Sequence, residues 1–148
     1  MLIRLALEED FPAIVEMARA NIEETRPEIG FDEHLAYETC YAYLDTASPT
    51  IFVAERNREV VGFLLADMYS YRASPGIHTM QEVLFVAPAH RGTRAAVMLM
   101  KHFIAWSIGL GAKEIIGGND NSFQSDRTAR FLEHFGFERV GHAMRRKL

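Results

Sequence analysis

The order of apolar and polar residues along the chain predicts a succession of strands and helices. Residues 2–7 alternate between the two kinds and predict a first strand. Apolar residues at helical spacing then predict one helix that begins near Asp10 and ends before Pro27, and another from about Asp32 to Asp45. A short polar side chain before an apolar run is typical of a helix start, so Asp10 is expected to cap the first helix.

After the second helix the hydrophobic period changes to that of strands. Residues 51–55 and 60–69 are expected to pair as a hairpin across a turn at 56–59, with a loop at 47–49 before them. A further strand is predicted over residues 77–86.

A polar loop and a long helix follow this strand, and their junction is the most informative part of the sequence. The loop at 87–92 leads into a helix from about Thr93 to Ile108, which is apolar nearly all round and is therefore expected to be largely buried. The first N–H groups of a helix lack intrahelical acceptors and carry partial positive charge. A loop that delivers Arg91 and Gly92 to this end therefore predicts an anion cradle.

The last third of the chain completes a mixed sheet. Residues 112–117 predict a strand parallel to its predecessor, because the intervening helix makes a crossover. Ser122 or Ser125 is expected to cap a helix that ends at Gly136. Two final strands are expected to close the sheet, at 137–140 and 142–148. The pattern predicts one α/β (α+β) domain over residues 1–148, with a mixed central sheet flanked by helices.

Composition narrows the class of protein. No segment approaches the roughly 18 uninterrupted apolar residues of a membrane span, and the chain turns acidic too early for a signal peptide, so we expect a cytoplasmic protein without a membrane partner. The net charge of −4 argues against nucleic-acid binding. Cys40 is the only cysteine and the six histidines lack metal-ligand spacing, so no metal site is expected.

Charge is unevenly distributed along the chain. The first fifty residues hold eleven acidic residues against three basic ones. This excess either reflects solvated helix faces or forms a negative rim that steers a cationic amine substrate.

The junction also resembles a known family. The residues from Val86 to Ala96 are similar to the acyl-CoA-binding segment of the GCN5-related N-acetyltransferases (GNAT), whose signature Gln/Arg-x-x-Gly-x-Gly/Ala follows a strand ending in Val-x-Pro. Arg91 fills the first position and Ala96 the last. Arg94 replaces the middle glycine, which normally lets the backbone approach the pyrophosphate, so Arg94 either reaches a phosphate itself or weakens binding.

A second match lies near the end of the chain. The segment 125–137 is similar to the family's Asn-x-x-Ala-x-x-Leu-Tyr-Glu-x-x-Gly-Phe ending, with Ser125 at the usual asparagine and Leu132 at the usual tyrosine. The order of predicted elements is that of the GNAT fold, so the resemblance covers essentially the whole chain.

The resemblance implies that the protein transfers an acetyl group from acetyl-CoA, as co-substrate, to an amine. Splayed strand backbone would hold the pantetheine arm, and the loop and helix start would hold the pyrophosphate. Asn121 would contact the pantetheine arm or the substrate, or serve only as a turn residue. The cofactor-binding residues implied are Leu84, Phe85, Val86, Arg91, Gly92, Thr93, Arg94, Ala95, Ala96, Asn121 and Ser125.

Glu82 is the candidate catalytic base. It matches a glutamate that some small-amine members carry in a Glu-x-Leu-x-Val strand, and partial burial against Met80 and Leu84 would raise its pKa towards the working pH. The other interpretation is a structural ion pair. With Leu132 at the tyrosine position, the proton for the thiolate is expected from another donor or from water. The candidate donors are Ser125, Asn121, Tyr69 and Tyr71.

We therefore expect a cytoplasmic N-acetyltransferase with direct transfer to a small-molecule or peptide amine, a cationic small amine being slightly favoured. The rival hypothesis is a catalytically weak or inactive module that binds CoA as a sensor or as a partner-binding subunit. A third is a cleft for another phosphorylated ligand. Family members often pair through their last strands, so analogy suggests a homodimer.

Overall fold

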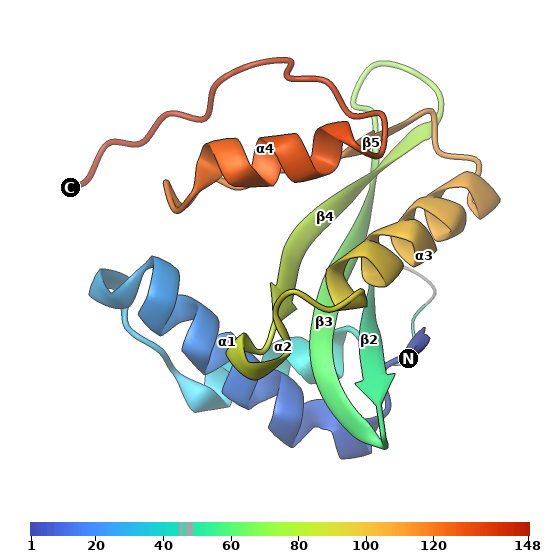
Figure 1. Cartoon of the computed structure of the whole chain (residues 1–148). Helices are drawn as coiled ribbons and strands as arrows, with labels where there is room; N and C mark the ends of the chain where they lie inside the picture. Colours follow the sequence, from blue (N-terminus) through green and yellow to red (C-terminus); the bar gives the residue numbers. More distant parts are fainter. Residues whose placement is uncertain (45, 47–48) are drawn as a thin grey trace. The chain divides into compact units, whose positions relative to one another are not determined.

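The computed structural model describes residues 1–44, 46 and 49–148 (Figure 1). The described chain forms two compact units, Met1–Ile116 and Gly117–Leu148. The first unit contains β1 (Leu2–Leu5), α1 (Phe11–Thr25), α2 (Glu33–Ala42), β2 (Thr50–Arg56), β3 (Glu59–Ser70), β4 (Ile77–Val86), α3 (Ala95–Gly109) and β5 (Glu114–Ile116). The second unit contains α4 (Ser125–Glu133). The first unit also contains three short 3-10 helices, at Glu8–Asp10, Pro27–Ile29 and Pro88–His90.

The five strands form one mixed sheet in the order β1-β2-β3-β4-β5. The first four are antiparallel to their neighbours, and β5 runs parallel to β4. The crossover that makes β5 parallel is α3, as the sequence predicted. The β2–β3 hairpin is also confirmed: Arg56 pairs with Glu59, and the two turn residues, Asn57 and Arg58, have positive φ, which suits a tight hairpin turn.

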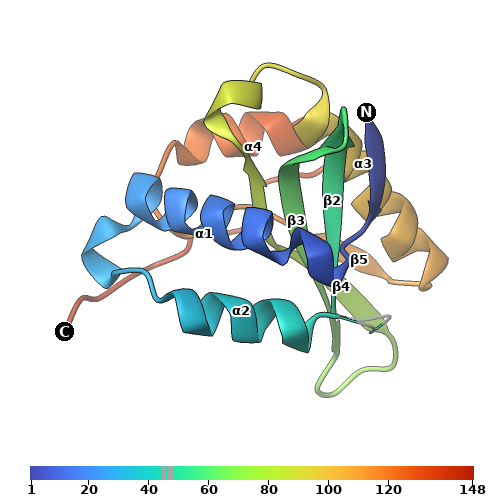
Figure 2. The same cartoon turned by 90° about the horizontal axis from the view of Figure 1, so that it is seen from below.

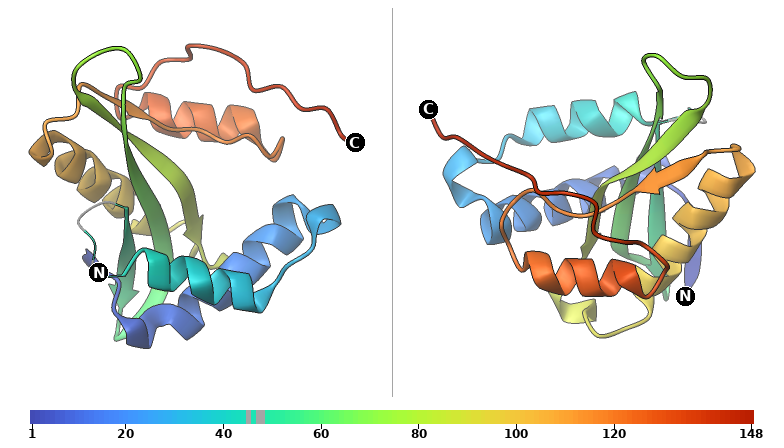
Figure 3. Two further views of the ribbon diagram at one scale, coloured as in Figure 1. Left: turned by 180° about the vertical axis from the view of Figure 1, so that it is seen from behind. Right: turned by 90° about the horizontal axis from the view of Figure 1, so that it is seen from above.

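Helices cover both faces of this sheet (Figures 2 and 3). On one face, α1 and α2 lie side by side and bury apolar side chains against the strands, among them Phe11 and Ile14 from α1 and Phe63 and Phe85 from the sheet. On the other face, α3 packs through Leu99, Met100 and Phe103, which are fully buried. The buried Thr79 and Ser107 hydroxyls meet there at 2.7 Å, which joins β4 to α3.

The long helix is less buried than its composition predicts. One face of α3 lies against the sheet, whereas Lys101, His102 and Ile108 are exposed, Ile108 at 70%. Its first turn begins at Ala95, two residues later than expected, and Arg94 occupies the N-cap position.

Asp10 lies at the N-cap of α1, but its carboxylate does not cap that helix. It turns back to accept bonds from the Arg4 guanidinium at 2.6 and 2.9 Å and from the Leu7 N–H at 2.8 Å. Burial alone would raise the pKa of Asp10, but these bonds and the Arg4 charge outweigh it and lower that pKa below its ordinary value. The buried carboxylate is thus held ionised and fixes β1 against the start of α1.

Asp10→Asn should lower the free energy of unfolding at neutral pH by about 2 kcal/mol, because it leaves the half-buried Arg4 with Glu55 as its one carboxylate. Because the folded-state pKa of Asp10 is depressed, this stabilisation is present above the unfolded-state pKa and is lost as the pH falls through the folded one. Urea unfolding at pH 7 and pH 3 tests this. A difference between wild type and variant that is as large at pH 3 as at pH 7 would contradict it.

The prediction of two closing strands is wrong. Residues 134–148 contain no strand, and the side chains from 138 onward are exposed, including Val140 at 82% and Met144 at 91%. A β-strand needs a neighbouring ladder to satisfy its backbone, and the described residues provide none for this segment. The expected strands at 137–140 and 142–148 therefore do not form.

Helix ends also differ from expectation. Asp32 caps α2 by accepting the Leu35 N–H at 3.0 Å, but α2 ends at Ala42, and the predicted end at Asp45 and loop residues 47 and 48 lie outside the described residues. Neither serine caps α4: Gln124 occupies the N-cap with left-handed backbone and Ser125 is the first helical residue. None of the described helices has both the length and the apolar composition that crossing a bilayer requires.

Candidate active site

Glu82 lies at an irregularity in the pairing of β3 with β4. Leu65 pairs with Val83 and Ala66 with Gln81, so Glu82 is the extra residue of a β-bulge. A bulge redirects the side chains around it. Glu82 consequently lies on the same face of the sheet as its neighbour Val83, which packs against the core beneath α1 and α2.

The contacts of Glu82 confirm that face. Its Oε1 accepts a hydrogen bond from the Tyr69 hydroxyl at 2.9 Å. Asp67 lies two residues before Tyr69 on β3 and therefore on the same face. It accepts a hydrogen bond at 2.5 Å from the hydroxyl of Tyr43, which directly follows α2. The carboxylate is exposed, so the partial burial expected for Glu82 is not found. The described residues give it a phenol partner and no ion pair.

Phenol and carboxylate groups gather on this end of the sheet. The hydrogen bond to Glu82 is the main cause that raises the pKa of Tyr69 to about 12. Burial and then the bond to Asp67 raise the pKa of Tyr43, with smaller contributions from the charges of Glu82 and Tyr69. A third pair joins Tyr71 to Glu114 at 2.8 Å. These phenols stay protonated at neutral pH, so the carboxylates are the negative groups of the cluster.

Beyond this cluster, β4 leaves its parallel neighbour. The β4–β5 ladder joins His78, Thr79 and Met80 to residues 114–116 and stops there, while β4 continues to Val86. The predicted pantetheine-binding residues Leu84, Phe85 and Val86 lie on this extension. β5 ends at Ile116, so this part of β4 lies beyond the ladder that joins the two strands.

The loop after β4 leads into α3 through a network of local hydrogen bonds. Gly92 has a φ of +81°, which a residue with a side chain rarely adopts. The Thr93 hydroxyl donates to the His90 carbonyl at 2.7 Å and accepts the Ala95 N–H at 3.3 Å. Ala96 lies in the first turn of α3, where backbone N–H groups have no intrahelical acceptor.

Arg91 is held by a residue that the sequence did not single out. Its guanidinium forms a two-point ion pair with Glu24 near the end of α1, at 2.8 and 2.5 Å, and its Nε donates to the Val86 carbonyl at 3.2 Å. The guanidinium also lies 5.3 Å from the centre of the Phe85 ring. Glu24 was one of eleven acids in the first fifty residues, and no local motif marked it.

Arg94 differs from Arg91 in its surroundings. It is exposed at the N-cap of α3, and within the described part of the chain it has no ion-pair partner. The start of α3 therefore presents one cation engaged with a carboxylate and another that is available to an anion.

Asn121 and Ser125 belong to the second unit. The Asn121 side-chain oxygen accepts bonds from the Asn119 amide at 2.8 Å and from the Phe123 N–H at 2.9 Å, so it closes a turn. Ser125 is exposed on the first turn of α4. Among the predicted site residues, Glu82, Leu84, Phe85, Val86 and the loop residues 91–96 share the first unit.

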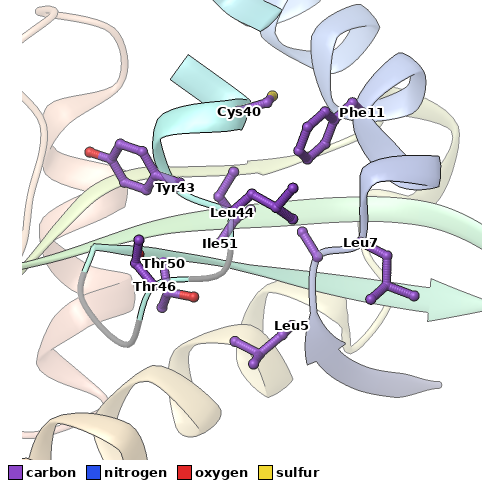
Figure 4. Close-up of a pocket in the computed structure, with 10 residues that line it drawn as sticks. Leu5, Leu7, Phe11, Cys40, Tyr43, Leu44, Thr46, Thr50 and Ile51 are labelled. Carbon is purple, nitrogen blue, oxygen red and sulfur yellow. The ribbon is translucent and has the colours of Figure 1, made fainter. Parts of the chain in front are cut away.

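A cavity of about 470 Å³ opens on the face of the sheet that α1 and α2 cover. Its walls come from α1, α2 and the segment that joins them, and Phe63, Leu65 and Val83 lie at the sheet side. A smaller cavity of about 280 Å³ lies between the start of the chain and the end of α2 (Figure 4). Cys40 lines both, and its burial raises the pKa of the thiol to about 11, which makes it a poor nucleophile.

The chain is similar to known proteins in sequence pattern and in fold. A family model described as the acetyltransferase (GNAT) family matches residues 11–137. No curated protein sequence matches the chain. Solved structures are similar in fold at low sequence identity. A transcriptional regulator from Bacillus halodurans C-125 has a TM-score of 0.83 and 20% identity, with 99% of each chain covered.

Two further structures are acetyltransferases. The aminoglycoside 6'-N-acetyltransferase AAC(6')-IG from Acinetobacter haemolyticus has a TM-score of 0.77 and 16% identity over 100% of this chain and 98% of its own. The structure of AAC(6')-Iy in complex with the bisubstrate analogue CoA-S-monomethyl-acetylneamine has a TM-score of 0.76 and 18% identity, with coverage of 99% and 97%. The mixed sheet flanked by helices is the fold that the resemblance implied. Since the family model matches well over half of its length, the chain belongs to the acetyltransferase (GNAT) family.

Proposed function

We propose that the protein is an N-acetyltransferase that moves an acetyl group from acetyl-CoA directly to a primary amine, with Glu82 as the catalytic base. The observation that carries this proposal is the position of Glu82 on the bulge of β4, exposed and just beyond the last β4 residue that pairs with β5. Its Oε1 accepts the Tyr69 hydroxyl, and no described residue donates to Oε2. That oxygen is available to a proton on the substrate.

The free carboxylate oxygen of Glu82 can accept the proton that the acceptor amine must lose. A primary amine is an ammonium ion at neutral pH, with a pKa near ~10 by analogy with lysine. Glu82 takes one proton and frees the lone pair of the nitrogen, which then bonds to the acetyl carbon as the carbon–sulfur bond breaks. The nitrogen loses a second proton, and the thiolate gains one. Acetyl-CoA supplies the acetyl group as an activated thioester.

The chain holds the carrier through β4 and the start of α3. Leu84, Phe85 and Val86 lie on the part of β4 beyond its ladder with β5, where the pantetheine arm would run. The turn at Gly92 and the first-turn N–H groups of α3 suit the pyrophosphate, and Arg94 adds a cation that has no ion-pair partner among the described residues. Holding both reactants in place supplies several kcal/mol by itself.

The thiolate takes its proton from solvent in this proposal. Leu132 stands where a tyrosine is usual in the family, and Tyr69 is a weak acid because Glu82 raises its pKa to about 12. Such a phenol would not readily protonate a thiolate. We assign Tyr69 instead to positioning Glu82.

A cationic acceptor is supported by the acidic groups around Glu82. Asp67 and Glu114 accept phenol hydrogen bonds on the same end of the sheet, and their carboxylates would attract an ammonium ion. A solved structure of similar fold is an aminoglycoside 6'-N-acetyltransferase, which supports an amine as the acceptor. We further propose a single cytoplasmic domain over residues 1–148, acting as a monomer or homodimer without nucleic acid or membrane.

A second candidate is a module that binds CoA without turnover. Arg94 at a glycine position and Leu132 at a tyrosine position favour it. Titration calorimetry of acetyl-CoA into the protein, followed by a screen of amines for release of free CoA, separates the two. Binding with amine-dependent CoA release supports the enzyme, and binding without release from any amine supports the module. No binding would overturn both.

A further inference from the structure

We propose that the 470 Å³ cavity between α1, α2 and the sheet binds the apolar body of the acceptor, so that the substrate is a primary amine carried by an aryl or branched alkyl group. This proposal rests on the proposed function, because it places the amine of that molecule at Glu82. The new element is the chemical class of the group that carries the amine, which is apolar.

The cavity shares a strand and a face with Glu82. Val83 lines it directly after Glu82 in the sequence, and Leu65, which pairs with Val83 across the bulge, lines it too. Because the bulge turns residues 82 and 83 to one face, an acceptor whose nitrogen reaches Glu82 can extend its other end along that face into the cavity.

The lining is apolar with few polar groups, which is the usual composition of a small-molecule site. Asp32 and Thr39 are polar residues of the lining, and both bond to the α2 backbone, at the Leu35 N–H and the Leu35 carbonyl respectively. Asn21 also lines the cavity, and no described residue bonds to its side-chain amide. It is therefore available to orient one polar atom of a largely apolar ligand.

The mouth of the cavity exposes apolar side chains. Leu35 is 58% exposed and Ile29, in the segment between the two helices, is 55% exposed. A ligand with an apolar group would cover these surfaces and displace water from them. A polyamine or a polyhydroxylated amine would instead lose hydration over the apolar lining, because Asn21, Asp32 and Thr39 are the polar residues that it could contact there.

The experiment compares three monoamines that differ in their apolar bodies with two amines that carry more than one positive charge. Initial rates with acetyl-CoA are measured for 2-phenylethylamine, isoamylamine, ethylamine, putrescine and kanamycin. We expect kcat/KM for the first two to exceed that for ethylamine by about tenfold or more, in line with the effect of filling an apolar pocket. Putrescine and kanamycin should be the poorest acceptors.

Two variants test the cavity itself. Ala36→Leu fills it from α2, and Leu35→Ala removes apolar surface at its mouth. Each should lower kcat/KM for 2-phenylethylamine about tenfold while changing that for ethylamine less than twofold. Ala105→Leu, the same change at an exposed position of α3, is the control and should alter neither. Because Leu35 is exposed, its variant stays informative if Ala36→Leu does not fold.

The outcomes separate this inference from the proposed function. Equal rates for all amines, or variants that affect ethylamine as much as 2-phenylethylamine, would overturn the apolar site and leave the acetyltransferase intact. A dimer in sedimentation that Leu35→Ala dissociates, with unchanged amine preference, would mean that a second copy covers the cavity, and would also overturn it. No turnover with any amine would reject the proposed function first.

Discussion

Glu82→Gln should reduce kcat by about 10²–10⁴-fold and leave the affinity for acetyl-CoA unchanged, because glutamine cannot accept the proton of the ammonium. The amide retains an oxygen that can accept the Tyr69 hydroxyl, so local structure should persist. Stopped-time assays with a good acceptor give the turnover, and calorimetry gives the acetyl-CoA affinity. Raising the pH towards the pKa of the amine should recover part of the loss, since more acceptor is then already deprotonated.

Glu114→Gln is the matched control for this experiment. Like Glu82, Glu114 is an exposed strand glutamate that accepts a phenol, from Tyr71 at 2.8 Å against 2.9 Å for Tyr69. It should lower kcat less than about threefold, through loss of local negative charge. Similar losses in both variants would show that the acidic cluster, and not proton transfer at Glu82, accounts for the effect. A Glu82→Gln enzyme with wild-type kcat would remove Glu82 from the mechanism.

The hydrophobic pattern predicted the elements of the first unit well because each of them packs apolar side chains against its neighbours. The apolar runs in 51–55 and 60–69 became β2 and β3, and the long apolar run after Gly92 became α3, since each buries apolar side chains against its neighbours. The same reasoning overreached at residues 137–148. There the segment has no described ladder to join, and its side chains from residue 138 onward are exposed.

Local sequence motifs predicted the candidate site residues, but they did not predict the tertiary partners of those residues. Glu82 and the 91–96 loop each lie in a short continuous motif. The bulge depends on how β3 pairs with β4, and the Arg91–Glu24 pair joins residues 67 positions apart, so neither leaves a local signal. The sequence separated Arg91 from Arg94 by their positions in the motif, but it did not indicate that only Arg91 is paired with a carboxylate among the described residues.

That difference leads to a prediction about acetyl-CoA affinity. Arg91→Ala combined with Arg94→Ala should weaken binding about 100-fold, or about 2.7 kcal/mol, because two cations beside the start of α3 are lost. Arg94→Ala alone should have the larger single effect, since Arg94 has no ion pair to give up within the described residues. Arg91 must give up its ion pair with Glu24 before it can bind a phosphate. Loss of so exposed a pair costs about 1 kcal/mol and lowers the net contribution of Arg91 to the binding free energy.

Glu24→Gln tests the exchange directly. Without the competing carboxylate, Arg91 is available to the phosphate from the start, so acetyl-CoA should bind several-fold more tightly, and Arg91→Ala should cost more in this background than in wild type. Arg72→Ala, which removes one exposed cation from the loop between β3 and β4, measures the general effect of charge and should change the affinity less than twofold. If Glu24→Gln instead weakens binding as much as Arg91→Ala does, the ion pair serves to position the loop, and Arg94 with the backbone of α3 would hold the phosphate without Arg91.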